Sequence, residues 1–316
     1  MTSDKLAAKI KKLALEAGYV DCGIASAEPF TKFAEAVESR KEQFPEAASL
    51  YEPMLGRAFP AGKHPWARSI VVCVRWYGKY KIPEEISAGI GRNYLFDRRY
   101  SGCPENDMPE RMKGGLEELG LRVRTGGVPD RWAAVRAGVA RFGRNNFVYT
   151  KKHGSWINIK TWLVDRELPR DEPRYEPICP ESCRLCIDEC PSAALEEPFC
   201  MRMDRCVAYL TYHAPEPIEE GLWRRMGHWI YGCDQCQLVC PLNRGRWREK
   251  EKAEWLEKLA PYLSDEALAE MDEETYRCVV QPAFWYIPPD GVQRWRRNAR
   301  RALENKNSGD SIRFFC

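Results

Sequence analysis

The sequence predicts an α+β protein made of three successive segments. Residues 1–168 mix helical and strand patterns, residues 169–246 contain most of the cysteines, and residues 247–316 are charged and mainly helical. The run SIVVCVRWY is β-branched and nearly continuous, as in a central strand that is buried on both faces. Apolar residues at helical spacing, with glycines where the pattern stops, indicate helices before and after this run.

The first segment is predicted to mix helices with short strands. Asp4 can cap the opening helix, and Gly18 can end it. Helices are expected at residues 4–17, 31–43, 109–119 and 130–138. Strands are expected in YVDCGIA, SIVVCVRWY, LRVRTGG, FGRNNFVYT and GSWINIKTWLV. The polar stretch from Lys79 to Pro109 contains GRNYLFDRRY and is expected to be a functional loop with a helix inside it.

The later part of the chain is predicted to be mainly helical outside the cysteines. A helical connection is expected over residues 216–229, followed by helices in PYLSDEALAEM and GVQRWRRNARRALEN. The closing stretch, NSGDSIRFFC, is expected to be loosely held.

The middle segment contains eight cysteines in two sets. They are Cys179, Cys183, Cys186 and Cys190, then Cys206, Cys233, Cys236 and Cys240, and a proline follows the last cysteine of each set. In two-cluster ferredoxins, three closely spaced cysteines bind one [4Fe–4S] cluster and the Cys-Pro cysteine binds the other. This order predicts one cluster on Cys179, Cys183, Cys186 and Cys240, and a second cluster on Cys190, Cys206, Cys233 and Cys236.

Structural zinc and disulfides are the alternative uses of these cysteines. Zinc sites typically take four ligands as two separated pairs and do not need a Cys-x-x-Cys-x-x-x-Cys-Pro run. Disulfide frameworks suit short secreted chains, whereas this chain has 316 residues and no apolar signal segment at its start. The cysteines therefore favour metal binding in a reducing cytoplasm. Three residues separate Cys179 from Cys183, one more than usual, and Cys200 is the nearby substitute for Cys179.

The overall charge gives little indication of a partner. The formal net charge is +3, and no apolar run approaches the length of a membrane span. Basic residues gather in two places, Arg294, Arg296, Arg297, Arg300 and Arg301, and Arg244, Arg246, Arg248 and Lys250. Such clusters can contact phosphates, which makes tRNA a candidate partner. The alternative is a solvated surface, because acidic residues between Glu249 and Glu274 offset the charge.

The cysteine segment and its flanks resemble epoxyqueuosine reductases, cobalamin- and iron–sulfur-dependent enzymes of tRNA queuosine synthesis. The matching residues are AVRAGVARFGRNNFVYT, GSWI, CRLCIDECPSAAL, RCVAYLTY, IYGCDQCQLVCPLN and WRRNARRAL. The resemblance implies a nitroreductase-like mixed α/β domain that binds a corrinoid, similar to the core of reductive dehalogenases, over residues 1–168. It implies a ferredoxin-like domain with two [4Fe–4S] clusters over residues 169–246 and a short helical tail over residues 247–316.

The resemblance also implies cobalamin as a second kind of cofactor, which the protein would position and tune. The residues expected to contact it are Phe142, Gly143, Arg144, Asn145, Asn146, Gly154, Ser155 and Trp156. Taken alone, FGRNN is more typical of an ordinary glycine turn with capping asparagines. His153, just before this second group, is interpreted as a loop residue.

Two departures from the family pattern concern the substrate. The family carries Val-Asp-Thr on a strand before the corrinoid motif, and its aspartate is the proposed proton donor. Counting back from Ala137 and Gly138, Arg124 takes that position here. The family also continues past the arginine-asparagine helix into helical repeats that help to bind tRNA, which this chain is expected to lack.

The replacement of the acid raises the question of another proton donor. An arginine stays protonated at neutral pH, so Arg124 cannot act as the acid, but it can hold an anionic substrate or lower the pKa of a nearby tyrosine. Tyr94 is the candidate donor, with Arg124 as its catalytic partner. The alternative is that Tyr94 is a packed aromatic residue with a satisfied hydroxyl.

The sequence therefore predicts a cytoplasmic oxidoreductase. A low-potential donor of the ferredoxin or flavodoxin type would supply electrons, which pass through the two clusters to a corrinoid that reduces a small-molecule or modified-nucleoside substrate. The alternative is an electron-transfer protein that reduces the corrinoid of a partner protein.

Overall fold

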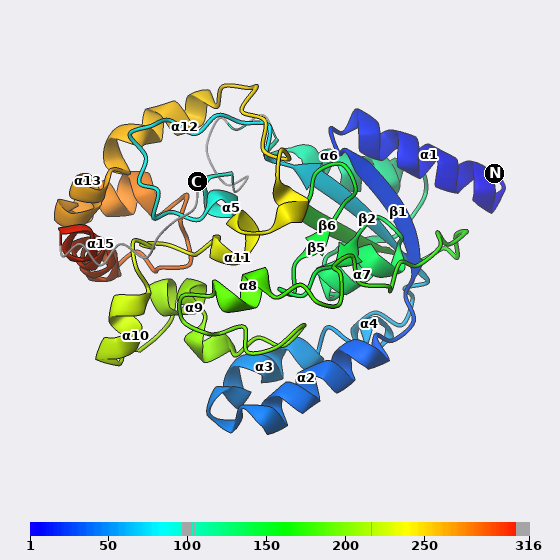
Figure 1. Cartoon of the computed structure of the whole chain (residues 1–316). Coiled ribbons are helices and arrows are strands. Elements are labelled where there is room, and N and C mark those ends of the chain that lie inside the picture. Colours follow the sequence, from blue (N-terminus) through cyan, green and yellow to red (C-terminus); the bar gives the residue numbers. More distant parts are fainter. Residues whose placement is uncertain (97–102, 104, 216, 308–316) are drawn as a thin grey trace. The chain divides into compact units, whose positions relative to one another are not determined.

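The computed structural model describes residues 1–96, 103, 105–215 and 217–307 (Figure 1). The chain forms two compact units. Unit 1 comprises Met1–Gly78 and Asp107–Cys183, and unit 2 comprises Lys79–Asn106 and Arg184–Cys316. This division differs from the three predicted segments, because residues 79–106 pack with the later part of the chain and the cysteine-rich segment is divided between the units. Residues 308–316 of the predicted loose end and residues 97–100 of GRNYLFDRRY lie outside the described residues.

Unit 1 is built on a four-stranded antiparallel sheet with the order β1-β2-β6-β3. Its strands are β1 (Asp21–Ser26), β2 (Ser69–Trp76), β6 (Ile157–Val164) and β3 (Val123–Thr125). Strand β2 is the predicted central strand, and its residues from Ser69 to Arg75 are buried. It pairs with β1 on one side and β6 on the other, so its backbone hydrogen bonds are made within the sheet.

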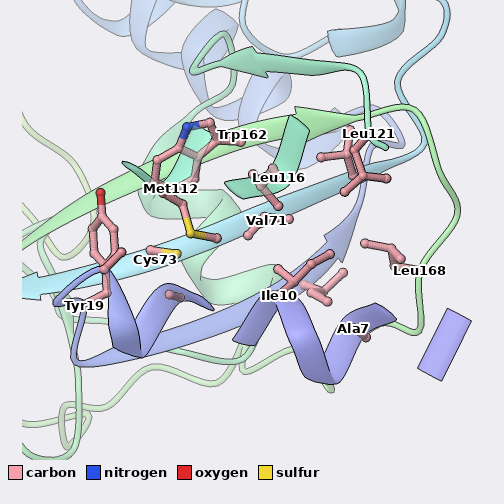
Figure 2. Packing of buried hydrophobic residues seen from close by; sticks show 14 of the residues in the cluster. Ala7, Ile10, Tyr19, Val71, Cys73, Met112, Leu116, Leu121, Trp162 and Leu168 are labelled. Atoms are coloured by element: carbon pink, nitrogen blue, oxygen red, sulfur yellow. The ribbon is translucent and has the colours of Figure 1, made fainter. Parts of the chain in front are cut away.

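One face of this sheet is covered by α1 (Ser3–Glu16) and α6 (Met108–Glu118). Figure 2 shows Ile10 of α1 and Met112 and Leu116 of α6 packed over Val71 and Cys73 of β2. The alternate residues of β2 point to the opposite face and are also buried, and α7 (Asp130–Arg136) contacts β1, β2 and β6. The sheet is therefore covered on both faces, which explains the continuous apolar run.

The remaining elements of unit 1 are one helix of 13 residues and several shorter elements. They are α2 (Thr31–Gln43), η1 (Pro45–Ala47), α3 (Ala48–Leu55), α4 (Pro60–Lys63), and the hairpin of β4 (Arg141–Phe142) and β5 (Val148–Tyr149). Thr2, rather than the predicted Asp4, caps α1, because its side chain accepts a hydrogen bond from the backbone of Lys5. Gly18 follows α1 with a φ of 102°, a left-handed conformation that suits a glycine at a helix end.

Apart from its last helix, which has 16 residues, unit 2 consists of short helices. Its elements are α5 (Arg92–Leu95), α8 (Leu185–Asp188), η2 (Met203–Arg205), α9 (Val207–Tyr212), α10 (Glu220–Arg225), α11 (Gln235–Leu238), η3 (Pro241–Asn243), α12 (Glu254–Leu259), η4 (Ala260–Tyr262), α13 (Asp265–Glu270), α14 (Glu273–Thr275), a π-helical turn η5 (Tyr276–Val280) and α15 (Val292–Asn307). The predicted helical connection over residues 216–229 contains only α10, and residue 216 lies outside the described part of the chain. No helix among the described residues is both long and apolar enough to cross a membrane.

Candidate iron–sulfur centre and cofactor loop

The predicted second cluster set lies entirely in unit 2, on segments held by short helices. Cys206 immediately precedes α9, and Cys236 lies in α11. Cys190 and Cys236 pack beside Cys186, Ile187 and Leu195 in one apolar cluster. Within the described residues, all thirteen cysteines are thiols rather than disulfides.

The thiols of this set lie within electrostatic reach of one another. Burial raises the pKa of the Cys236 thiol, and the neighbouring Cys206 and Cys190 raise it further. Burial likewise raises the pKa of Cys233, with Cys236 as the next cause. The backbone N–H of Gln235 donates to the Cys233 sulfur at 3.5 Å. A thiol whose pKa is raised by burial becomes a thiolate only when a cation compensates its charge, which is the role that cluster iron would have here.

The cysteine-bearing segment is fastened to residues 89–92 by backbone hydrogen bonds. The N–H of Ile230 donates to the carbonyl of Gly89 at 2.7 Å, and the N–H of Gly91 donates to the carbonyl of Tyr231 at 2.8 Å. The N–H of Arg92 donates to the Oδ2 of Asp234 at 2.6 Å. This pairing explains why residues 79–106 belong to unit 2.

The predicted first set is divided between the two units. Cys179 and Cys183 belong to unit 1, and Cys186 and Cys240 belong to unit 2. Cys183 closes a turn in which its N–H donates to the carbonyl of Pro180 at 3.1 Å. On the other side of the segment, Cys240 leads into η3, which begins at Pro241.

The predicted cofactor loop connects β4 and β5 in unit 1. The N–H of Gly143 donates to the carbonyl of Phe147 at 2.8 Å, and the side chain of Asn145 bonds both the N–H of Phe147 and the hydroxyl of Tyr149. A Cβ at residue 143 would lie 2.4 Å from the Tyr149 ring, so only glycine fits. Gly143 and Asn145 therefore shape the turn itself.

Arg144 and Asn146 have a different role in this loop. The Arg144 Nε and the Asn146 Nδ2 are buried, and neither has a hydrogen-bond partner within the described residues. Asn146 has a φ of 63°, a left-handed conformation that asparagine tolerates better than most residues. Unpartnered buried donors are costly, so two of them in one loop indicate a group that accepts hydrogen bonds there.

The second part of the predicted cofactor site follows β5. Thr150 and Gly154 exchange backbone hydrogen bonds at 3.0 and 3.2 Å, and Gly154 has a φ of 59°. Ser155 and Trp156 are buried. His153 lies in the intervening loop, as interpreted from the sequence, and its ring stacks on Trp76 with centroids 4.6 Å apart.

Arg124 and Tyr94 belong to different units. Arg124 is exposed on β3, where it pairs in register with Leu163 of β6. Tyr94 lies on α5, where its hydroxyl is 3.0 Å from that of Tyr212. Burial raises the pKa of Tyr94, with Tyr212 as the next cause. Tyr94 thus has the packing and the hydroxyl partner of the alternative interpretation, and its role as a proton donor stays a prediction.

The basic helix predicted near the end of the chain is α15, and several of its arginines serve the fold. Arg294 donates to the carbonyl of Ala214, and Arg296 donates to the carbonyl of Met271, each at 2.6 Å. Arg300 pairs with Glu270, and Arg301 is only 1% exposed. The charge that the sequence suggested for phosphate contacts is thus partly used within unit 2.

Sequence reasoning missed Asn298 of α15 and Asp234, which lies between two of the predicted cluster ligands, Cys233 and Cys236. Both side chains are buried and hydrogen-bonded. Burial raises the pKa of Asp234 to about 6. An asparagine among arginines on an otherwise amphipathic helix was the available signal for Asn298, because a carboxamide there needs buried partners.

Comparisons with known proteins agree with this arrangement. Residues 179–243 match the family described as a 4Fe-4S double cluster binding domain, and all eight predicted ligands fall within that range.

A curated epoxyqueuosine reductase from Cyclobacterium marinum is 28% identical over 288 residues, 88% of this chain and 91% of that protein. The enzyme of the same name from Shewanella oneidensis is 33% identical over 235 residues, 70% of this chain and 56% of that protein. The Escherichia coli epoxyqueuosine reductase is 34% identical over 185 residues, 58% of this chain and 47% of that protein. The chain thus spans about half the length of the last two relatives.

Solved structures show the same fold. An epoxyqueuosine reductase with an epoxyqueuosine-modified tyrosine tRNA stem loop superposes with a TM-score of 0.75 and 23% identity, over 98% of this chain and 84% of that one. The Streptococcus thermophilus epoxyqueuosine reductase gives a TM-score of 0.75 and 22% identity over the same shares. The chain is therefore an iron–sulfur protein with a double [4Fe–4S] cluster-binding domain. It is a homologue of the epoxyqueuosine reductases, which are oxidoreductases.

Proposed function

We propose that this protein is an iron–sulfur, cobalamin-dependent reductase. The observation that carries the proposal is the segment from Cys179 to Cys240, with eight cysteines in the order of a two-cluster ferredoxin. Two clusters linked by crossing Cys-Pro ligands suit the transfer of single electrons at low potential. Cys190, Cys206, Cys233 and Cys236 would hold the second cluster, and the mutual electrostatic influence of their thiols supports that assignment.

The β4–β5 loop fits a corrinoid. Amide side chains at the rim of a corrin ring offer carbonyl oxygens, and the Arg144 Nε and Asn146 Nδ2 are buried donors that need such acceptors. Gly143 and Asn145 would fix the turn that presents these donors, and Phe142, Gly154, Ser155 and Trp156 would complete the contacts. When bound, the corrinoid would supply a strongly reducing cobalt centre.

For the substrate, the proposal names a chemical class and no single compound. A solved relative carries an epoxyqueuosine-modified tRNA stem loop. We infer that this chain reduces a small molecule or a modified nucleoside, with electrons from a ferredoxin or flavodoxin. Arg124 suits an anionic group on that substrate, because an exposed guanidinium can bind an oxyanion through two parallel hydrogen bonds.

Arg124 also favours a second candidate function. With arginine in place of the acid, the chain would pass electrons to the corrinoid of a partner protein instead of protonating a substrate. The two candidates differ in whether the chain itself retains a corrinoid.

Anaerobic reconstitution with iron, sulfide and hydroxocobalamin, followed by desalting, tests the proposal. Cluster and corrinoid absorbance should both remain with the protein, with about one corrinoid retained for each chain. Clusters without corrinoid would support the electron-transfer candidate instead. A chain that takes up no iron–sulfur cluster would contradict both.

Variants of the loop make this test specific. Asn146→Asp keeps the shape and the tolerance for a left-handed backbone but removes the Nδ2 donor, and Arg144→Ala removes the other donor. Each should weaken corrinoid retention roughly tenfold, the loss expected for one buried hydrogen bond. Arg141→Ala is the matched control, because that guanidinium already donates to the carbonyls of Glu176 and Pro177. If all three variants retain the corrinoid equally, Arg144 and Asn146 do not contribute to binding it.

A further inference from the structure

One face of α15 presents a row of side-chain hydrogen-bond donors to the cysteine-bearing segments of unit 2. The donors are Arg294, Asn298, Arg301 and Asn305, which recur every three or four residues and so share one helix face. Arg294 donates to the carbonyl of Ala214, and Arg301 donates to the carbonyl of Trp229. Asn305 donates to the carbonyls of Arg224 and Gly227 at 3.2 and 3.0 Å.

Asn298 joins two separate segments through one amide nitrogen. Its Nδ2 donates to the carbonyl of Thr211 at 2.7 Å and to the carbonyl of Ile230 at 2.9 Å. Thr211 lies near the end of α9, which begins right after Cys206, and Ile230 lies three residues before Cys233. The carboxamide therefore connects the backbone that follows one predicted ligand to the backbone that precedes another.

The surroundings hold this connection rigidly. Asn298 is fully buried, and its Oδ1 accepts hydrogen bonds from Arg297, so the orientation of the amide is fixed. The hydroxyl of Thr211 accepts a hydrogen bond from the N–H of Gly232 at 2.9 Å, which ties the same two segments a second time. Trp295, on the same helix, stacks on Tyr231 with centroids 4.7 Å apart and an interplanar angle of 6°.

The carbonyl of Thr211 needs a donor because it lies in the last turn of α9. The last carbonyls of a helix have no partner within it, and burial without a partner is costly. Asn298 is fully buried and supplies the partner for Thr211. The same donation reaches Ile230, whose own N–H is bonded to Gly89. The segment before Cys233 is therefore held on two sides, by α15 and by residues 89–92.

We propose that Asn298 is a positioning residue for the second [4Fe–4S] cluster, fixing the separation between Cys206 and Cys233. The inference rests on the proposed function, which assigns both cysteines to that cluster. Cys206 lies 16 residues after Cys190 and 27 residues before Cys233, whereas Cys233 and Cys236 are only three residues apart. A remote ligand depends most on tertiary contacts for its place.

The test compares Asn298→Ala with Asn305→Ala in the anaerobically reconstituted full chain. Asn305→Ala is the matched control. It removes an asparagine from the same helix face, but Asn305 does not connect the segment after Cys206 to the segment before Cys233. Cys206→Ser provides the reference signal for loss of the second cluster. Iron content, electron paramagnetic resonance of the reduced protein, and the rate of iron loss to a chelator are measured for each variant.

Asn298→Ala should release iron from one cluster roughly tenfold faster than the wild type, the factor that one buried hydrogen bond provides. Its resonance spectrum should shift toward that of Cys206→Ser while the signal of the other cluster persists. Asn305→Ala should keep both signals. A merely structural role for Asn298 predicts a lower unfolding temperature with both signals unchanged, and that outcome would overturn the inference.

A second variant covers the case in which Asn298→Ala fails to fold. Thr211→Val keeps the shape of the side chain and removes the hydroxyl, which accepts from the N–H of Gly232 and donates to the carbonyl of Ala208. It should affect the same cluster, and a normal second-cluster signal in this variant would contradict the inference. If the wild-type chain does not bind two clusters, the proposed function fails as well. If the wild type binds two clusters and the variants keep both cluster signals unchanged, only this inference is overturned.

Discussion

The ring of Tyr94 lies against the backbone of Gly232, the residue immediately before Cys233. A Cβ at residue 232 would lie only 2.1 Å from the Cε2 of Tyr94, and Gly232 has a φ of 77°. The glycine therefore serves two purposes, a left-handed turn and close contact with an aromatic ring. The residue immediately before the predicted cluster ligand Cys233 must therefore be glycine.

We expect Gly232→Ala to lower the free energy of unfolding by about 2–4 kcal/mol, from backbone strain and overpacking together. Anaerobic urea titration, followed by circular dichroism and cluster absorbance, measures this change. Gly245→Ala is the matched control, because Gly245 has a φ of 68° but no atom within 4 Å of the added Cβ. The control should lose only about 1–2 kcal/mol. Equal losses in the two variants would show that contact with Tyr94 is unimportant.

Tyr94 makes stability sensitive to alkaline pH. Burial raises its pKa above the ordinary value of 10.0, so the unfolded chain releases this proton at a lower pH than the folded chain. The stabilisation is fully present below pH 10 and is lost as the pH rises toward the folded-state pKa. Tyr94→Phe should therefore show a shallower decline in stability above pH 10 than the wild type.

At neutral pH the same variant should be about 1 kcal/mol less stable, through loss of the hydrogen bond with Tyr212. Tyr262→Phe is the control, because Tyr262 is among the exposed aromatic residues of unit 2. An unchanged alkaline slope in Tyr94→Phe would contradict the burial argument.

The local pattern of the sequence predicted the main helices and strands of unit 1. It did not predict which segments of the chain come together in unit 2. Helix α1 was predictable because its apolar residues follow the helical period, and strand β2 because its β-branched run is nearly continuous, as in a strand buried on both faces. The bonds of Gly89 with Ile230 and Tyr231 join residues far apart in the chain, and no local period records them. The local pattern therefore did not predict that residues 79–106 group with the later part of the chain.

The candidate site shows the same limit. The order of the eight cysteines was readable because each cluster takes several ligands from closely spaced residues. The sequence did not reveal that α15 donates hydrogen bonds to buried carbonyls. Its composition is that of an exposed basic helix, and only the structure shows the carbonyl partners of Asn298 and Arg301. Similarly, Tyr94 as a proton donor depended on a lowered pKa, whereas its burial in unit 2 raises it.

Arg124 allows a test of substrate chemistry that leaves the fold intact. Because it is exposed on β3, both Arg124→Ala and Arg124→Asp should change the free energy of unfolding by less than about 0.5 kcal/mol. Arg124→Asp places a carboxyl group where the resemblance puts the proton donor. If the substrate is epoxyqueuosine in tRNA, single-turnover reduction should be faster in Arg124→Asp than in the wild type.

If the substrate is a different anion held by the guanidinium, both variants should instead raise the KM for it. Arg166→Ala, another exposed arginine of unit 1, is the control for nonspecific charge effects. Wild-type kinetics in both Arg124 variants would exclude Arg124 from substrate binding and proton transfer alike.

His228 makes stability sensitive to acid. Burial lowers its pKa from 6.5 to about 4, with Lys306 as the next cause and Arg301 acting in the same direction against the opposing charge of Asp265. The unfolded chain takes up a proton near pH 6.5, whereas the folded chain takes it up only near pH 4. The stabilisation is therefore present above pH 6.5 and is lost as the pH falls toward 4, by up to about 3 kcal/mol.

Urea unfolding of the anaerobic protein at several pH values between 4 and 7 measures this loss. His228→Gln cannot take up the proton, so its stability should fall less steeply over that range than that of the wild type. His64→Gln, in unit 1, is the matched control and should keep the wild-type slope. If His228→Gln and the wild type lose stability in parallel, another group causes the acid sensitivity, and the burial of His228 contributes nothing to it.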